Sequence, residues 1–460
     1  MNENKKGLFT MDDGKNLFVT FALVSSLFFL WGVCNGMIDV MDKHFQTELG
    51  LSKAQSAWVQ FAHYLGYFLM SLPAGFLASR FGYKWGIIAG LLLVAVGGFW
   101  FLPATHFNAL ARAGSLSPTT AFVGYLVGVC AIAAGLTFLE TVANPYTTVL
   151  GPTQFAATRI NMAQSCNGVG WIFGPIIGGM FFYSKDAAGN STGNETLYIP
   201  YVIVSVVVLV LAVVFFFAYI PDIKTEDDYH LDDATPGVSH SIWKHPHFVM
   251  AVAAQFFYVA AQAGIFSFFI NYMTSETPAL PKSVTSDLLK SWFETSKTGV
   301  LGLSDKGAAN LASVGFFCFL IGRITGSAML KKFSAHKILG LYGVINVVAC
   351  LLIFLKLGWL SVACVFLSYF FMSIMFPTIF ALGIFGLGAR AKKAAAAIVM
   401  AIMGGAILPK LMGYVADKYD MSRGFIVPLF CFAFVAFYGF SWPKLSGAKG
   451  LHEVKTSGGH

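Results

Sequence analysis

Two carboxylates lie inside long apolar stretches of this sequence, where a charge is energetically costly. Asp39 is in the first apolar run, and Glu140 lies deep in the fourth. An ionisable side chain in hydrocarbon costs about 2.5 kcal/mol or more, so a functional role is the default expectation. Burial disfavours the ionised form, so such a group keeps its proton near neutral pH and releases it when its cavity hydrates. We therefore predict that Asp39 and Glu140 exchange a coupling proton. The alternatives are a structural hydrogen bond or ion pair for Glu140, and a hydrated position near the outer surface for Asp39.

Trp31 and Asn35 precede Asp39 at intervals of four residues. In a helix that turns by about 100° per residue, the three side chains lie within an arc of about 80°. Amides and carboxylates bind sugar hydroxyl groups, and an indole ring stacks on the apolar C–H face of a pyranose. This face is therefore predicted to bind a sugar, although Trp31 or Asn35 taken singly is equally compatible with helix packing.

Five carboxamides lie at helical spacing in two distant parts of the chain. Gln164 and Asn167 share a face of the fifth apolar run, while Gln255 and Gln262 share a face of the seventh, joined near its outer end by Asn271. A lone amide in a membrane helix often only bonds a neighbouring helix. Five amides at such spacing favour a polar, substrate-binding cavity.

The basic residues within or next to apolar runs indicate gating positions. Arg80 and Lys84 are in the link after the second run, whereas Arg323 is near the cytoplasmic end of the eighth and Lys337 follows it. Lys410 lies deeper, in the eleventh run, and is expected to face a cavity or pair with a carboxylate.

Composition defines the class of protein. Of 460 residues, 57% are apolar and 11% are charged, whereas soluble domains have about 25% charged residues. The net charge of +8 comes mainly from short loops, where basic residues orient helices, so a nucleic-acid partner is not indicated. The seven cysteines are irregularly spaced and form no metal motif. Without a nucleophile–base pair or metal cluster, we expect no enzyme, no catalytic residue, no metal and no cofactor.

Apolar runs long enough to span a bilayer predict an all-α membrane protein with twelve transmembrane helices. Basic residues are richer in the links that an inside N-terminus places in the cytoplasm. We therefore expect a multi-pass protein of the inner (plasma) membrane, monomeric, with both termini cytoplasmic. The predicted spans are 17–42, 56–79, 84–104, 119–149, 157–183, 198–220, 246–273, 307–330, 335–356, 359–387, 394–416 and 423–442.

The chain is predicted to form two six-helix halves, residues 1–220 and 246–460, joined by a polar cytoplasmic linker at 221–245. A long outer loop, 274–306, interrupts the second half. Within this loop, residues 283–294 carry apolar side chains at a spacing that predicts a short amphipathic helix: Leu288, Leu289, Trp292 and Phe293.

The fifth and eleventh spans repeat a G-x4-P-x3-G pattern, at Gly170, Pro175 and Gly179 and at Gly404, Pro409 and Gly413. Glycine allows helices to approach closely and proline allows them to bend. The repeat supports two related halves, while generic membrane-helix packing is the alternative.

Several motifs resemble a known family. Residues 75–84 (GFLASRFGYK) are similar to the cytoplasmic gating motif of the major facilitator superfamily, with Ser79 where an aspartate is usual. Six further segments resemble the fucose:proton symporter family, which belongs to this superfamily: FFLWGVCNGMIDV (28–40), LETVANPYTTVLGP (139–152), RINMAQSCNGVG (159–170), AQFFYVAAQAGIFSFFINY (254–272), GRITGSAMLKKFSAHK (322–337) and FMSIMFPTIFALGI (371–384).

The resemblance implies two pseudo-symmetric six-helix halves that work by alternating access. It also implies that an acid on span one and a glutamate on span four couple the proton, and that an amide pair on span five contacts the sugar. These positions match Asp39, Glu140, Gln164 and Asn167. The chain departs from the family pattern at three positions, which leaves the sugar open: Gly36 replaces a second asparagine, Phe266 a tryptophan and Lys410 an apolar residue.

We therefore predict a symporter that imports a hexose-type monosaccharide (fucose, glucose, galactose, mannose or N-acetylglucosamine) with protons. Sodium coupling is an alternative, because carboxylates and amides serve both ions. An efflux antiporter would need an apolar, aromatic pocket rather than amides. A non-transporting sugar sensor would need a signalling domain, which the sequence does not provide.

Overall fold

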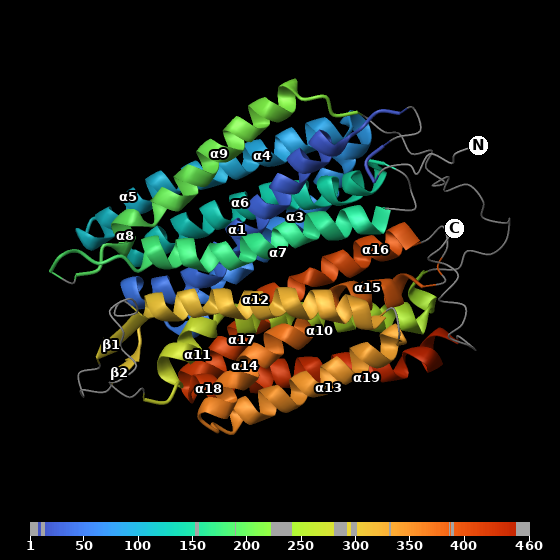
Figure 1. Ribbon diagram of the computed structural model, residues 1–460. Coiled ribbons are helices and arrows are strands. Elements are labelled where there is room, and N and C mark those ends of the chain that lie inside the picture. Colours follow the sequence, from blue (N-terminus) through green and yellow to red (C-terminus); the bar gives the residue numbers. More distant parts are fainter. Residues whose placement is uncertain are drawn as a thin grey trace, which may run out of the picture. The chain divides into compact units, whose positions relative to one another are not determined.

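Helices dominate the computed structural model of the chain (Figure 1). Among the residues that the structure describes, twelve helical segments are long and apolar enough to cross a membrane, which confirms the predicted all-α fold. The described residues are 8–10, 14–151, 156–188, 190–221, 242–279, 292–295, 301–330, 333–385, 387 and 391–447.

The chain separates into two compact units. Unit 1 contains Met1–Gly50 and Ala62–Thr225, whereas unit 2 contains Leu51–Phe61 and Glu226–Gly459. The short segment between the first two spans thus belongs with the second unit, and helix α3 (Trp58–Phe81) starts in unit 2 and continues in unit 1.

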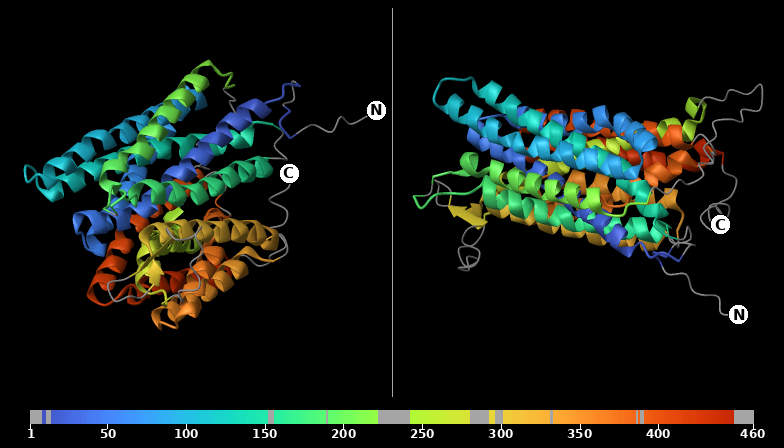
Figure 2. Two further views of the ribbon diagram at one scale, coloured as in Figure 1. Left: turned by 60° about the vertical axis from the view of Figure 1, so that its left-hand side comes forward. Right: turned by 90° about the horizontal axis from the view of Figure 1, so that it is seen from above.

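Unit 1 is a bundle in which α1 packs on α7, and α4 packs on both α6 and α9. Figure 2 shows these helices, coloured blue to green, running along one another. Besides α3, the helices of unit 1 are α1 (Phe18–Leu49), α4 (Tyr83–Phe99), α5 (Phe101–Arg112), α6 (Pro118–Val149), α7 (Ala156–Phe182), α8 (Gly193–Thr196) and α9 (Tyr198–Phe217).

The α1–α7 contact depends on glycine. Gly32 and Gly36 of α1 face Gly170 and Gly174 of α7, and a Cβ added at any of the four would come within 3.0 Å of the opposite helix. Small residues let membrane helices approach until their backbones touch. Gly170 therefore has the packing role that its place in the repeated motif predicts.

Unit 2 contains shorter helices, since several spans are interrupted within the apolar region. Span seven breaks at Phe268 between α10 and α11, and span ten breaks between α14 and α15. Its elements are α2 (Lys53–Ser56), η2 (Ile242–Lys244), α10 (Pro246–Ser267), α11 (Phe269–Ser275), β1 (Phe293–Thr295), β2 (Leu301–Leu303), α12 (Asp305–Leu330), α13 (Ala335–Phe354), α14 (Trp359–Met372), α15 (Met375–Ile384), α16 (Ala391–Met400), η6 (Ala401–Met403), α17 (Gly404–Lys418), α18 (Met421–Gly424) and α19 (Ile426–Ser446).

The repeated motif has an equivalent use in unit 2. A Cβ at Gly404, the first residue of α17, would collide with the backbone of Phe256 on α10. In both units, therefore, a motif glycine on the fifth helix of the set packs against the first. Gly413 makes a second close contact, with the backbone of Lys53 and Ala54.

The predicted amphipathic helix at 283–294 is wrong at its end. Phe293 begins strand β1, which pairs antiparallel with β2 and places Phe293 opposite Leu303. Local periodicity does not record this pairing, because the partner strand lies further along the chain. Residues 280–291, with Leu288 and Leu289, lie outside the described residues, as do 296–300 and positions 222–241 of the expected linker.

Candidate functional site

Trp31 and Asn35, predicted on one face of α1, meet a tyrosine of α3. The Trp31 Nε1–H donates a 2.7 Å hydrogen bond to the Tyr67 hydroxyl oxygen, and the Asn35 side chain bonds the same hydroxyl. Asn35 and Asp39 are both buried. The Asn35 Oδ1 has no hydrogen-bond partner among the described residues, so it is a candidate acceptor for a ligand hydroxyl, since buried polar atoms are normally paired.

Glu140 lies on α6, where it is half-buried. Within the described part of the chain no side chain forms an ion pair or hydrogen bond with it, so the structural ion pair considered from the sequence is not found there. The Glu140 charge has an electrostatic effect on Tyr67 of α3, but no hydrogen bond joins the two side chains in the described part of the chain.

Gln164 is held by a residue that the sequence reasoning missed. Its Nε2 donates a 2.8 Å hydrogen bond to Oδ1 of Asn144, which lies on α6 four residues after Glu140. Residues at i and i+4 share a helix face, so this spacing was a usable signal. The bond directs Gln164 toward the α6 face that carries the acid.

Asn167 has a different environment. Its Nδ2 donates a 3.2 Å hydrogen bond to the backbone carbonyl of Phe28 on α1, and the side chain is buried. Asn167 therefore ties α7 to α1 next to the glycine contact. Its predicted role as a sugar ligand stays a prediction.

Three further polar or aromatic residues of α3 flank this region and were not singled out from the sequence. The ring of His63 lies 5.1 Å from that of Tyr64 and 5.0 Å from that of Tyr67. His63 is buried, and its Nδ1 has no partner among the described residues. The spacing of residues 63, 64 and 67 on one helix could have indicated a polar stripe in the second span.

The amides of unit 2 lie on two consecutive helices of the seventh span. Gln255 on α10 is fully buried, and neither of its side-chain polar atoms has a partner within the described regions. Gln262 is half-buried on the same helix. Asn271 is buried on α11, beyond the break at Phe268. Their predicted role in sugar binding stays a prediction.

The predicted gating residues fall into two groups. Lys84 donates a 3.2 Å hydrogen bond to the carbonyl of Ala218, and the Nε of Arg323 donates a 3.4 Å bond to that of Ser373. Lys84 thus joins the start of α4 to the residue after α9, and Arg323 joins α12 to the middle of the tenth span. Arg80 and Lys337 are exposed.

Lys410 does not pair with a carboxylate of the described residues. Its Nζ lies 3.8 Å from the centre of the Trp58 ring, a cation–π contact. The Asp417 carboxylate nearby accepts bonds of 3.0 and 2.9 Å from the backbone N–H groups of Lys53 and Ala54. Helix α17 therefore holds the start of the second span by an aromatic contact and by capping.

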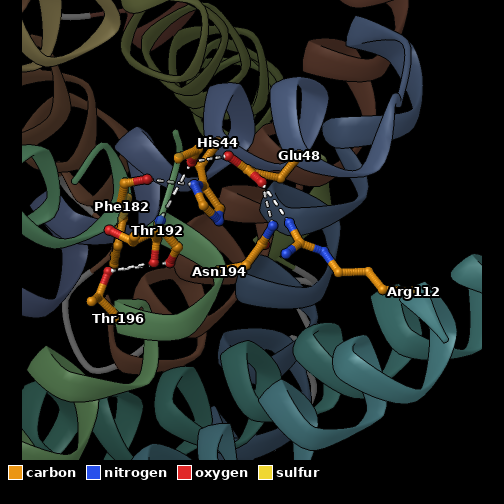
Figure 3. Close-up of polar contacts among 9 residues, drawn as sticks. His44, Glu48, Arg112, Phe182, Thr192, Asn194 and Thr196 are labelled. Atoms are coloured by element: carbon orange, nitrogen blue, oxygen red, sulfur yellow. Dashed lines mark hydrogen bonds and ion pairs between the residues drawn. The ribbon is translucent and has the colours of Figure 1, made fainter. Parts of the chain in front are cut away.

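A polar network, the Glu48 network, closes one end of unit 1 (Figure 3). The Glu48 carboxylate accepts hydrogen bonds from Arg112 at 2.9 Å, from Ser191 and from Asn194. His44, one turn earlier, is buried, and its Nδ1 lies 2.8 Å from the carbonyl oxygen of Phe182. These contacts join the ends of α1 and α5 to the α7–α8 link.

A second network, the Lys356 network, is found in unit 2. The Lys356 Nζ lies 3.3 Å from Glu276 and 3.0 Å from Asp420, and Ser422 donates a 3.1 Å bond to Glu276. The hydrogen bond to Asp420 raises the pKa of Lys356 above its ordinary value. Lys356 also has a positive φ of 57°, a conformation that is uncommon for a residue other than glycine.

The described residues contain no group of three or more His, Cys, Asp or Glu side chains arranged to hold a metal ion. The seven cysteines are all free thiols. What the site offers is hydrogen-bonding groups, aromatic rings and an acid within a membrane-spanning bundle.

Comparison with known proteins agrees with this description. The sequence pattern of the Major Facilitator Superfamily matches residues 17–383. The L-fucose-proton symporter of Escherichia coli is 33% identical over 441 residues, covering 92% of each chain. The glucose/galactose transporter of Brucella abortus is 31% identical over 423 residues, covering 91% of this chain and 93% of the relative. A crystal structure of the E. coli fucose:proton symporter covers 93% of this chain and 99% of its own, at 31% identity and a TM-score of 0.62.

Twelve apolar spans in two helical units, with polar side chains inside the spans, define a multi-pass membrane transport protein rather than an enzyme. The chain belongs to the fucose:proton symporter family of the Major Facilitator Superfamily.

Proposed function

We propose that the protein imports a hexose-type monosaccharide together with protons, by alternating access. The relatives named for sugar:proton symport and for glucose and galactose transport support this proposal. The observation that carries it is Glu140, an acid inside a membrane span, with Asn144 one turn later on the same helix bonding the amide of Gln164. An ionisable group next to sugar-type ligands is the arrangement that coupled transport requires.

In the proposed mechanism the protein binds the sugar while Glu140 is protonated. Glu140 loses its proton after the sugar has been released. Trp31 stacks on a C–H face of the ring while Asn35 accepts a hydroxyl hydrogen bond. Gln164, fixed by Asn144, contributes a further amide. Asn167, Gln255, Gln262 and Asn271 belong to the proposed ligand set on sequence grounds, and Asp39 acts as the second coupling acid.

Transport assays on purified protein test the proton roles. We expect labelled hexose to accumulate in proteoliposomes under an inward proton gradient, with fucose, glucose, galactose, mannose and N-acetylglucosamine compared. In Glu140→Gln, gradient-driven accumulation should be abolished, while counterflow of the same sugar continues, because exchange needs binding but no net proton movement. Asp39→Asn should reduce accumulation in the same way.

The control is Glu195→Gln, which neutralises an exposed carboxylate of unit 1 and should transport like the wild-type protein. Accumulation that survives both Glu140→Gln and Asp39→Asn would contradict the proton roles. Accumulation driven by a sodium gradient but not by a proton gradient would replace the proton with sodium.

The proposed setting is the inner membrane, with both termini in the cytoplasm and a monomeric protein. The distribution of basic links supports this orientation. Protease access to a C-terminal tag in inverted, but not right-side-out, vesicles is the expected result. Light scattering of the detergent-purified protein should give the mass of one chain, and a larger protein mass would contradict the monomer.

A further inference from the structure

A pair of carboxamides joins α6 to α7 one helical turn after Glu140. The Gln164 Nε2 donates a 2.8 Å hydrogen bond to Oδ1 of Asn144, and both side chains are half-buried. Asn144 shares the α6 face of Glu140, because residues four positions apart are neighbours on the surface of a helix. The amide pair, Asn144 and Gln164, therefore lies beside the acid that the proposed function assigns to proton coupling.

The backbone that carries Asn144 is held in place by other bonds. The Thr147 hydroxyl donates a 2.7 Å hydrogen bond to the Asn144 carbonyl oxygen. The Nε of Arg159, buried on α7, donates a 3.0 Å bond to the Thr147 carbonyl oxygen. A hydrogen bond from a charged donor is stronger than one between neutral groups, so Arg159 already fastens α7 to this turn of α6. What the bond between Asn144 and Gln164 adds is a fixed orientation of the two amides.

One hydrogen bond uses only part of what two carboxamides offer. Each has a carbonyl oxygen and an NH₂ group, so the pair keeps the Asn144 Nδ2 as a donor and the Gln164 Oε1 as an acceptor. Neither atom has a hydrogen-bond partner in the described part of the chain, and neither is sealed from solvent. If both amides were rotated, one donor and one acceptor would still remain. This combination suits hydroxyl groups, which both donate and accept.

We propose that Asn144 is a specificity-determining residue, which together with Gln164 binds two neighbouring ring hydroxyl groups of the sugar. The Asn144 Nδ2 donates to one hydroxyl oxygen, and the Gln164 Oε1 accepts from the next hydroxyl. A sugar with hydrogen in place of either hydroxyl leaves one amide group without its partner, which is unfavourable. The amide pair thus selects against sugars deoxygenated at these two positions. This inference rests on the proposed function, because it names the part of the sugar that the site recognises.

The test is counterflow into proteoliposomes, which measures binding and exchange without net proton movement. The probe is the best transported of fucose, glucose, galactose, mannose and N-acetylglucosamine. Its competitors are its derivatives in which one ring hydroxyl is replaced by hydrogen. With the wild-type protein, the derivatives at two adjacent positions should compete about fivefold to tenfold less well than the parent sugar, as expected for one lost hydrogen bond.

Asn144→Ala removes one amide and releases the other. The KM for counterflow of the parent sugar should rise about tenfold, because two hydrogen bonds are lost or weakened. The maximal rate should stay within about twofold, since lost binding that is equal in all states raises KM alone. The same two derivatives should now compete as well as the parent sugar. No charge changes, so the pH dependence of gradient-driven uptake should remain that of the wild-type protein.

Exchanging the two amides tests whether they act as a pair. Asn144→Gln and Gln164→Asn each change one side chain by a methylene group, across a gap that the backbone sets. Each alone should raise the KM about fivefold. The double variant keeps the summed length and should return to within about twofold of the wild-type KM, because residues in contact are not additive. The matched control is Asn190→Ala, an exposed amide of unit 1 that bonds Asp186; it should leave the KM and the selection unchanged.

The possible results separate this inference from the function on which it depends. If Asn144 only fastens the helices, Asn144→Ala lowers the Tm but still selects against the deoxy derivatives, and the inference is wrong while the function stands. A wild-type protein that accepts every ring-deoxy derivative equally, or a double variant no better than its single variants, would also overturn it. If Asn144→Ala is not folded, as judged by its Tm, unchanged selection in Asn144→Gln overturns the inference. If the wild-type protein shows neither counterflow nor gradient-driven accumulation of any tested hexose, both proposals fail.

Discussion

The Glu48 network of unit 1 and the Lys356 network of unit 2 occupy equivalent places in the two sets of six spans. Each uses a carboxylate where the first span of its unit ends, a cation at the end of the third span, and polar groups from the link between the fifth and sixth. In the proposed orientation both lie on the outer side. The two networks therefore make contacts at equivalent places, but with different residue types.

The two networks differ in the charge at their centre. In unit 1 a single carboxylate, Glu48, gathers one cation and two neutral donors; Glu48 is 9% exposed and the Arg112 cation 48%. In unit 2 a single cation, Lys356, gathers two carboxylates; Lys356 is 43% exposed, and Glu276 and Asp420 are 13% and 27% exposed. A buried charge that loses its partners is costly, whereas an exposed ion pair contributes little. Both units therefore have a polar network at the same place, but we expect the two networks to contribute differently to the free energy of unfolding.

The largest effect on stability is expected from Glu48→Gln. Arg112, Ser191 and Asn194 would lose their charged acceptor, and the new amide adds a donor that competes with them. We expect the free energy of unfolding to fall by about 3 kcal/mol. Thermal unfolding in detergent measures it, with Glu195→Gln as control. An unchanged Tm would show that the Glu48 network does not hold unit 1 together.

A smaller effect is expected from Glu276→Gln in unit 2. Lys356 keeps Asp420 as its partner, and the site is partly solvated. The loss should be about 1 kcal/mol in the same unfolding assay. A loss as large as that of Glu48→Gln would contradict the difference drawn between the two networks.

The pH dependence of the Lys356 network follows from its raised pKa, whose main cause is the hydrogen bond to Asp420. A group with a folded-state pKa above its unfolded value of about 10.4 stabilises the fold fully below that pH. The contribution is lost as pH rises through the folded-state pKa. Lys356→Met should therefore lower the Tm slightly from pH 7 to about pH 10, with the difference from wild type vanishing in more alkaline solution. A Tm difference that grows with pH would contradict this sign.

The smallest effect concerns salt. At about 1 M ionic strength the screening length falls to about 3 Å, so the Lys356 pairs, which consist of charges alone, should weaken more than the Glu48 contacts, which include hydrogen bonds from Ser191 and Asn194. The Tm loss caused by Glu276→Gln should shrink in high salt, and that caused by Glu48→Gln should persist. Equal salt sensitivity of the two variants would argue that both networks are equally solvated.

Much of the fold could be predicted because membrane spans are encoded locally. Twelve runs of sufficient length were countable, and a helix satisfies its own backbone in lipid. The β1–β2 pair was missed, since its hydrogen bonds join separate segments. The break at Phe268 between α10 and α11 was likewise not visible in an unbroken apolar run.

For the candidate site, the sequence indicated which residues are important, but not which residues on other helices they contact. Asp39 and Glu140 were conspicuous because acids are rare in apolar runs. Asn144 and Tyr67 were not, as their importance lies in bonds across helices to Gln164 and Trp31. Lys410 was expected to face a cavity or pair with a carboxylate, and the tertiary structure places its Nζ against the ring of Trp58.

By itself, then, the sequence determined the number of spans, the polar residues within them and the motif glycines Gly170, Gly404 and Gly413 that pack closely, because each depends on side-chain type and on spacing along one helix. Only the tertiary structure decided which polar groups meet. Hydrogen bonds are short and directional, so the bonds from Trp31 to Tyr67 and from Gln164 to Asn144 form only once α1 packs on α3 and α6 on α7.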